Sequence, residues 1–219
     1  MRVQLKDIEE VIKRLDKETK KFKNPIVSEI SFENNPYKVL ISCLLSLRTK
    51  DNVTAKATNN LFNKAKNPKE ILKLTTKQIE KLIYPVGFYK TKAKRIREIT
   101  KTLIENYNSK VPSDIEELLK LKGVGRKTAN IVLAFAYHKP ALPIDTHCHR
   151  IPNRFGWIKT KTPEQTEIEL KKILPKKYWI EFNNTFVIFG QNICVPISPF
   201  CSKCPIRIYC KRIGVTRSR

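Results

Sequence analysis

Apolar residues recur at helical spacing along almost the whole chain. Near the N-terminus, Ile8, Val11 and Leu15 fall on one face of a helix predicted over residues 3–21. Sustained alternation of apolar and polar residues is missing, and so are the turn dipeptides that join paired strands. The sequence therefore predicts an all-α protein.

About ten helices are expected. The helix over residues 36–47 is the most apolar, and it opens with Pro36, a residue suited to a first helical turn. Ser113 begins a capped start for a helix that ends near Leu121. The tail from Cys194 has no helical period, so something other than a core is expected to order it. The other helices are expected over residues 51–64, 67–72, 76–84, 88–107, from about Gly125 to Tyr137, and over 146–155, 163–174 and 177–193.

The chain is strongly basic. Its 219 residues include 44 Lys and Arg against 20 Asp and Glu, which gives a formal net charge of +24. This balance favours a polyanionic partner, and nucleic acid is the leading candidate because a basic surface gains affinity by releasing counterions from phosphates. A lysine-rich, heat-adapted surface is the alternative, but heat adaptation usually raises glutamate together with lysine.

The expected location is the cytosol, or the nucleus in a eukaryote, with no membrane partner. No apolar run approaches the roughly 20 residues that span a bilayer. Residues 1–16 alternate charged and apolar side chains rather than forming a signal-peptide core. Six cysteines in such a reducing compartment favour metal binding over disulfides.

Four of the six cysteines form a compact run with the spacing C-x6-C-x2-C-x5-C. These are Cys194, Cys201, Cys204 and Cys210. A structural zinc site is the main alternative, since four thiolates also suit tetrahedral zinc. Zinc ribbons usually bring two separated C-x2-C pairs, so the uneven gaps favour an iron–sulfur cluster. Cys43 lies in the apolar helix and is expected to be a packed core residue.

Two glycines, Gly123 and Gly125, are expected to form a tight turn between helices. The second helix starts at about Gly125, where free backbone N–H groups and the positive end of the helix dipole can bind a phosphate. A plain corner between two helices is the alternative. Basic Lys122 and Arg126 beside the turn favour binding of a DNA backbone.

Lys127 lies in the first turn of that helix, where the helix dipole disfavours a cation. By itself it reads as a solvated lysine that contacts phosphate. A desolvated amine close to positive charge is, however, also what a Schiff-base nucleophile requires. Asp145 lies 18 residues further on and is expected to cap the next helix. A capping aspartate is held rigidly, so it can also serve as a catalytic carboxylate.

Several motifs occur together in a family-like order. They are LKGVGRKTANIVL at residues 121–133, DTH at 145–147, the cysteine run, and the segments 44–46, 49–51 and 86–89. In these motifs the chain resembles endonuclease III, the iron–sulfur member of the helix-hairpin-helix DNA glycosylases. The similarity covers nearly the whole chain, and it identifies the expected cofactor as one [4Fe-4S] cluster held by the four cysteines of the run.

The resemblance implies a two-lobed all-α fold. Residues 29–139 would form a six-helix barrel with the helix-hairpin-helix, and residues 1–28 and 140–219 the iron–sulfur cluster domain. The protein would be a monomer that binds double-stranded damaged DNA. It would remove oxidised pyrimidines such as thymine glycol and cleave 3′ to the abasic site, with Lys127 forming a Schiff base at C1′ and Asp145 assisting.

The resemblance also implies a set of DNA contacts, and the chain departs from the family pattern both in the residues that enter the duplex and in the loop between the first two cysteines. Arg48 stands where many members have a glutamine that fills the space of the flipped base, and Phe88 where a leucine wedge is common. The loop over residues 195–200 is often basic in the family but is uncharged here. Nearby basic side chains are expected to replace it. The remaining DNA contacts are expected from Lys50, Gly123, Gly125, Arg126, His147, Lys203 and Arg207, with Lys211 and Arg212 as further tail cations.

The motifs leave two other functions open. One is a mismatch glycosylase of the same superfamily, specific for adenine or thymine and without strand cleavage. Those relatives usually have another residue at the position of Lys127. The other is a non-catalytic DNA-binding module with a structural or redox cluster, in which Lys127 and Asp145 would be coincidental.

Overall fold

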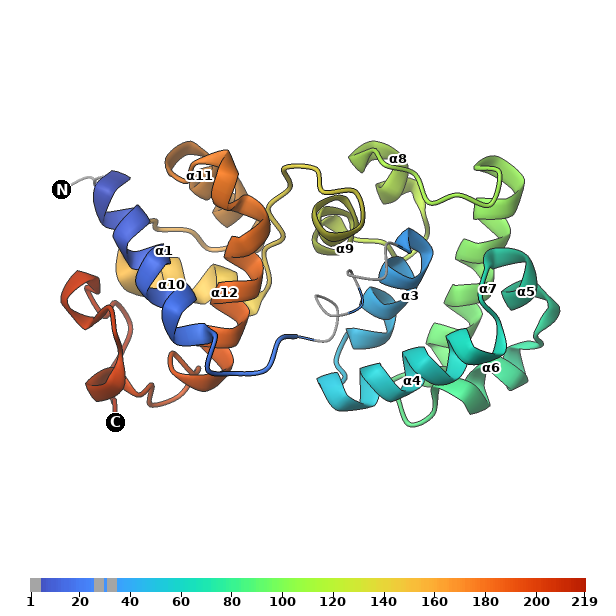
Figure 1. The fold of residues 1–219 in the computed structure, drawn as a ribbon, viewed down its shortest axis with the longest axis horizontal. Helices are drawn as coiled ribbons and strands as arrows, with labels where there is room; N and C mark the ends of the chain where they lie inside the picture. Colours follow the sequence, from blue (N-terminus) through green and yellow to red (C-terminus); the bar gives the residue numbers. More distant parts are fainter. Residues whose placement is uncertain (1–4, 26–29, 31–34) are drawn as a thin grey trace. The chain divides into compact units, whose positions relative to one another are not determined.

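The computed structural model describes residues 5–25, 30 and 35–219. All elements of secondary structure assigned in these ranges are helices, and none is a strand. The prediction of an all-α protein is confirmed. The chain divides into two compact units, Met1–Pro25 with Pro140–Arg219, and Ile26–Lys139 (Figure 1). The expected boundary between residues 28 and 29 lies outside the described residues. Within the described ranges no helix is both long and apolar enough to cross a membrane.

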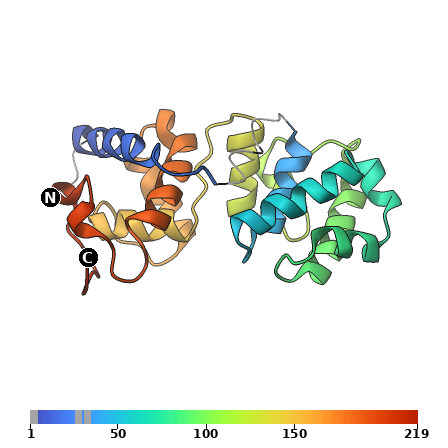
Figure 2. The same ribbon diagram turned by 60° about the horizontal axis from the view of Figure 1, so that its bottom comes forward.

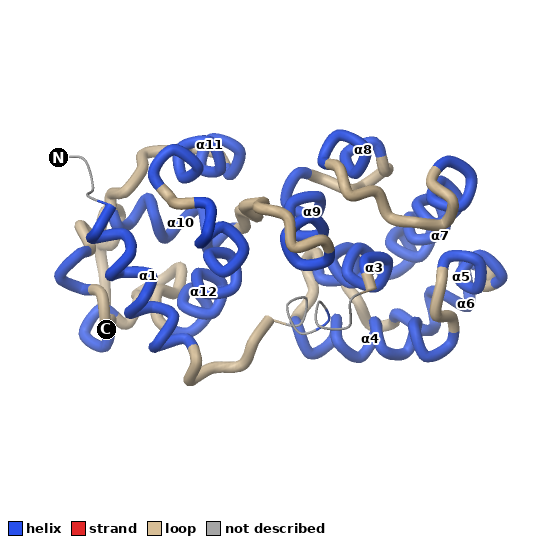
Figure 3. The backbone as a smooth tube through the Cα atoms, turned by 45° about the horizontal axis from the view of Figure 1, so that its top comes forward, coloured by secondary structure: helices blue, strands red, loops and turns tan. Residues whose placement is uncertain are grey.

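The unit over Ile26–Lys139 is called the hairpin unit here. Its helix α3 (Pro36–Ser46) packs against α4 (Asp51–Lys64), α7 (Tyr89–Asn106) and α9 (Arg126–Ile131), as Figure 3 shows. Val39, Leu40 and Leu45 on α3 are fully buried, which explains why this segment is the most apolar of the sequence. The shorter helices are α5 (Pro68–Lys73), α6 (Thr76–Ile83) and α8 (Ile115–Lys120).

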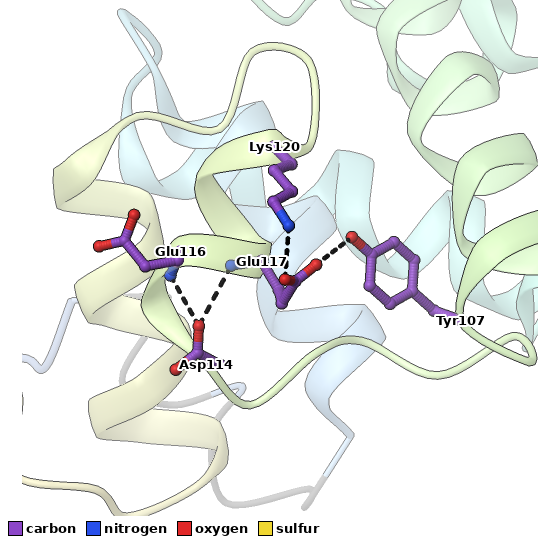
Figure 4. Close-up of polar contacts among 5 residues, drawn as sticks. All are labelled: Tyr107, Asp114, Glu116, Glu117 and Lys120. Atoms are coloured by element: carbon purple, nitrogen blue, oxygen red, sulfur yellow. Dashed lines mark hydrogen bonds and ion pairs between the residues drawn. The ribbon is translucent and has the colours of Figure 1, made fainter.

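Helix α8 begins one residue later than the sequence predicts. Asp114, and not Ser113, is its N-cap, with Oδ1 accepting hydrogen bonds from the N–H groups of Glu116 at 2.9 Å and Glu117 at 3.2 Å (Figure 4). A carboxylate also interacts favourably with the positive end of the helix dipole, an advantage that a serine lacks. The hydroxyl of Ser113 instead accepts a hydrogen bond from Lys139 at 3.1 Å.

Figure 4 also shows the contacts of Glu117 in the first turn of α8. Glu117 accepts hydrogen bonds from Lys120 at 2.6 Å and from the Tyr107 hydroxyl at 2.8 Å. The helix expected to continue to Tyr137 is not uniform, because α9 ends at Ile131 and Val132–Ala136 form a π-helical turn. The wider turn leaves the buried positions apolar, so the sequence pattern does not reveal it.

The other unit, Met1–Pro25 with Pro140–Arg219, is called the cysteine unit here. Helix α12 (Trp179–Asn192) packs against α1 (Leu5–Thr19) and against α10 (Thr146–Phe155), and α11 (Pro163–Ile173) packs against α10 (Figure 2). Phe182 and Phe186 stack with ring centroids 3.8 Å apart. The predicted apolar face of the first helix, including Ile8, is buried in this core.

The tail after α12 has only two short 3-10 turns, Cys201–Lys203 and Arg207–Tyr209. It nevertheless shares the core of the unit, because Ile206 is fully buried there. Its backbone also bonds to α10, with the N–H of Ile213 donating to the carbonyl of Arg154 at 3.0 Å. The expectation that the core does not order the tail is therefore wrong at this point.

Candidate active site

The predicted glycine turn connects α8 to α9. Gly123 adopts a left-handed φ of 86°, and Val124 is buried between the two helices. Gly125 is the N-cap of α9 without any side-chain cap, and a Cβ atom at Gly125 would meet nothing within 4 Å. The N–H groups of the first turn of a helix have no intrahelical partner. The turn therefore presents an open surface of backbone donors.

Lys127 is the second residue of α9 and is half-buried, whereas its neighbour Arg126 is exposed. Burial raises the pKa of the Cys43 thiol on α3 to about 12, and the charge of Lys127 opposes this rise. Lys127 thus lies close enough to α3 to act electrostatically on a core thiol. Cys43 is buried, as predicted.

Arg48 and Phe88 meet at the surface of the hairpin unit. Arg48 follows α3 and Phe88 precedes α7, and both have left-handed φ values, 52° and 59°. The guanidinium carbon of Arg48 lies 5.8 Å from the centre of the Phe88 ring, which is a cation–π contact. Phe88 was expected as the first residue of a helix. It is instead the N-cap of α7, and the residue is 63% exposed.

One pocket joins this pair to the glycine turn. It is lined by Leu44, Leu47, Arg48, Phe88, Thr91, Lys92, Arg95 and Gly123. Arg95 packs so closely on Gly123 that a Cβ there would lie 2.8 Å from its side chain. Arg95 also pairs with Glu98 at 2.9 Å, and Glu98 lies 3.7 Å from Lys122 of the turn. These contacts tie the turn to α7.

Asp145 is the N-cap of α10, as predicted. Its Oδ1 accepts hydrogen bonds from the N–H groups of His147 at 2.9 Å and Cys148 at 2.7 Å. The segment before it is held by Asn183 of α12, whose side chain donates to the Pro143 carbonyl at 3.1 Å. Both capping bonds use the same oxygen, so Oδ2 is not part of the cap.

His147 lies against α12 at Gly190, where any Cβ would overlap the imidazole ring. Its Nδ1 lies 3.0 Å from Nη2 of Arg150. The same Arg150 nitrogen donates to the Cys194 carbonyl at 2.7 Å. A chain of contacts therefore runs from the start of α10 to the first cysteine of the run.

All four cysteines of the run line one cavity in the cysteine unit. Two N–H groups reach their sulfurs: Nη1 of Arg154 lies 3.5 Å from Cys194 Sγ, and the N–H of Arg212 lies 3.3 Å from Cys210 Sγ. Burial raises the pKa of the Cys204 thiol to about 12 and raises that of Cys210. In the described part of the chain, no three His, Cys, Asp or Glu side chains form a group that could hold a single metal ion.

The remaining predicted DNA contacts are exposed cations. Lys50 is exposed at the N-cap of α4, and Lys203 and Arg207 are exposed on the two 3-10 turns of the tail. Lys127 belongs to the hairpin unit and Asp145 to the cysteine unit.

The comparisons with known proteins agree with one another. Residues 41–176 match the model of the HhH-GPD superfamily base excision DNA repair proteins. The endonuclease III of Thermotoga maritima is 50% identical over 179 residues, which are 82% of this chain and 84% of that protein. The chain belongs to the endonuclease III family.

Two solved structures of endonuclease III resemble the chain over nearly its full length. One is a trapped covalent intermediate with DNA, in an estranged-adenine complex. It has a TM-score of 0.83 and 31% identity, and the match covers 96% of this chain and 97% of that one. The other is a non-covalent DNA complex with a TM-score of 0.86 and 32% identity, and it covers 96% of both chains. This chain spans only about half to three fifths of the plant and animal endonuclease III homologues that it matches.

Several residues of the site could not be found from the motifs. Arg150, Arg154 and Gly190 act through contacts with segments about 40 residues away in sequence. The position of Lys92 could have been recognised from the sequence, because it falls four residues before Ile96 and therefore on the buried face of α7. A charged residue on an otherwise apolar helix face is rare unless it is paired.

Proposed function

We propose that this protein is a bifunctional DNA glycosylase and AP lyase that removes oxidised pyrimidines from duplex DNA. The observation that carries the proposal is the half-buried Lys127 in the first turn of α9, directly after an uncapped glycine turn. Membership in a family with a member trapped covalently on DNA supports the same chemistry.

Lys127 is the proposed nucleophile. Its amine attacks C1′ of the damaged nucleotide, and the glycosidic bond breaks with its electron pair going to the departing base. Opening of the sugar ring then gives an imine between Lys127 and C1′. The imine acidifies the C2′ proton, and loss of this proton expels the 3′ phosphate and cuts the strand.

Asp145 is proposed to stabilise the positive charge that develops on the sugar and to help activate the amine. Two backbone N–H groups hold its Oδ1, so the carboxylate is fixed in place before the substrate binds. Its Oδ2 stays outside the cap and is the oxygen that we assign to this role.

We propose that the protein binds both the phosphate backbone of the DNA and the gap that the extruded base leaves. The open turn at Gly123 and Gly125, with Arg126, would hold a phosphate. Arg48 and Phe88 would enter the duplex where the base leaves, which offsets the cost of unstacking. Lys50, His147, Lys203 and Arg207 are proposed as further contacts to the strand backbone.

We further propose one [4Fe-4S] cluster, held by Cys194, Cys201, Cys204 and Cys210. Four cysteine thiolates would hold such a cluster, and the uneven spacing of the run favours it over a single zinc ion. All four cysteines line one cavity, and N–H donors to two of the sulfurs suit thiolate ligands. When bound, the cluster would cross-link the tail to the rest of the unit.

The cluster has its own test. Purified protein should absorb visible light and contain about four irons per chain, and Cys201→Ser should lose both the colour and affinity for DNA. Zinc in place of iron by elemental analysis would overturn this assignment without touching the proposed chemistry of Lys127.

In the same proposal, residues 29–139 form a six-helix barrel, and residues 1–28 with 140–219 the iron–sulfur domain. The protein acts as a monomer, on DNA in the cytosol or the nucleus.

The function is tested with a duplex that contains one thymine glycol. We expect release of the free base together with a strand break that leaves the β-elimination product at the 3′ end. Base release without a strand break would favour a mismatch-type glycosylase. Binding without either product would favour a non-catalytic DNA-binding module.

A further inference from the structure

Lys92 is a buried lysine that points into the hairpin unit from the first turn of α7. Its residue is only 9% exposed. The ammonium group donates to the carbonyls of Leu45 at 2.8 Å and Leu47 at 2.6 Å, and to Oγ1 of Thr49 at 3.2 Å. An ammonium group has three donors, so all of its hydrogen-bonding capacity is spent on the loop over residues 45–49.

The same loop is joined to the turn that carries Phe88. Thr49 Oγ1, which accepts from Lys92, also accepts a hydrogen bond from the N–H of Gly87 at 3.2 Å. The carbonyl of Arg48 lies so close to Gly87 that a Cβ there would be only 2.7 Å from it. Lys92 therefore ties together two segments that are about 40 residues apart in sequence.

Both segments carry a residue with left-handed backbone. Arg48 and Phe88 have φ values of 52° and 59°, which non-glycine residues adopt only when their surroundings impose them. Lys92 binds the backbone carbonyls on either side of Ser46 and reaches the side chain just after Arg48. These hydrogen bonds place Lys92 where it can impose this conformation on the loop.

We propose that Lys92 is a positioning residue whose ammonium group locks the 45–49 loop to the Gly87 turn, so that Arg48 and Phe88 enter the duplex as one preformed wedge. This inference rests on the proposed function. Lys92 does not touch the reacting atoms. It lowers the entropic cost of binding, because two loops that are already locked together need not become ordered around an extruded base.

The charged surroundings of Lys92 are simple. The charged residues that line the pocket with it are Arg48 from the loop and Arg95 from α7, and the glycine turn contributes only Gly123. No acidic residue among those described lines this pocket. Burial lowers the pKa of the Lys92 ammonium to about 8. Raising the pH through 8 therefore removes one of its three donors, while both arginines stay protonated.

The test compares Lys92→Met with Lys94→Met, which changes an exposed lysine two residues further along the same helix. A duplex with thymine glycol beside 2-aminopurine reports base extrusion by stopped-flow fluorescence, and single-turnover assays report base release. Strand cleavage at an abasic site in single-stranded DNA, which needs no wedge, reports the Lys127 chemistry alone.

We expect Lys92→Met to lower the extrusion signal and the duplex base-release rate on the order of tenfold, with single-stranded cleavage unchanged. Lys94→Met should behave as wild type. The wild-type extrusion signal should also fall with a midpoint near pH 8, and the residual signal of Lys92→Met should not vary across that range.

Three results would overturn the inference: normal extrusion by Lys92→Met, an equal loss in all three assays, or a wild-type signal that does not change through pH 8. If Lys92→Met fails to fold, Thr49→Val removes the hydroxyl that joins Lys92 to Gly87, and it should reproduce the selective loss. Absence of any strand cleavage by the wild type would instead contradict the proposed function, so the two failures are distinguishable.

Discussion

The imidazole ring of His147 fills the space that a side chain at Gly190 would need. This contact sets how closely α12 approaches the first turn of α10, where Asp145 forms the cap. An added methyl group would push His147 and the start of α10 outward. The geometry of the proposed carboxylate therefore depends on a glycine 45 residues away in sequence.

Gly190→Ala should destabilise the protein by about 1–3 kcal/mol, because the methyl group overpacks a buried contact. Urea denaturation measures this loss. Gly125→Asn is the matched control, since a Cβ at Gly125 meets nothing within 4 Å and asparagine is a good N-cap. Equal free energies of unfolding for the two variants would contradict the described packing of His147.

Gly125→Asp should separate DNA binding from stability. Aspartate is a good N-cap, so the free energy of unfolding should change by less than about 0.5 kcal/mol. Its charge would face the bound phosphate, and the Kd for undamaged duplex should rise on the order of tenfold, or about 1.4 kcal/mol. Gly125→Asn caps without the charge and should bind nearly as wild type. Unchanged affinity of Gly125→Asp at fixed salt would remove the turn from the interface.

Asp145→Asn should slow the reaction far more than it weakens binding. Asparagine caps a helix about as well as aspartate, so α10 should keep its start. The carboxylate charge is lost, and single-turnover base release should fall on the order of a hundredfold. Fluorescence anisotropy with the same duplex gives the affinity. Losses of similar size in rate and affinity would indicate that Asp145 is only a structural cap.

Arg48→Gln should change the preference for the base opposite the lesion. An arginine only donates hydrogen bonds, whereas a glutamine both donates and accepts. Guanine offers two neighbouring acceptors, O6 and N7, so Arg48 should favour guanine over adenine. Single-turnover rates with each opposite base should show this ratio falling on the order of tenfold in Arg48→Gln. The same ratio in both proteins would place Arg48 away from the opposite base.

The sequence predicted the elements whose signals are local. The buried face of α1, the cap of α10 by Asp145 and the burial of Cys43 all follow from periodicity or residue type. The predicted starts of α8 and α7 were wrong because neighbouring residues compete for the N-cap position. Asp114, and not Ser113, caps α8. Phe88 is the N-cap of α7 and has a left-handed backbone conformation, so it does not belong to the helix.

The contacts that support the site were beyond the sequence because they join distant segments. Nothing in the local pattern around Gly190 indicates that it meets His147 of α10. Nothing around Arg154 indicates that it donates to the carbonyl of Val195, which follows the first cysteine of the run. The burial of Ile206 was missed for the same reason, since one isoleucine in an irregular tail has no period to reveal it. Chemical motifs thus pointed to the residues that we propose to react, and the structure supplies the contacts that hold them.

The most direct test of the central claim is covalent trapping at Lys127. Wild-type protein incubated with abasic duplex and borohydride should give a stable protein–DNA adduct, which peptide mass spectrometry should place on Lys127. Lys127→Gln should give no adduct, and Lys94→Gln, an exposed lysine of α7, should give as much as wild type. No adduct with wild type, or the same adduct with Lys127→Gln, would contradict the account.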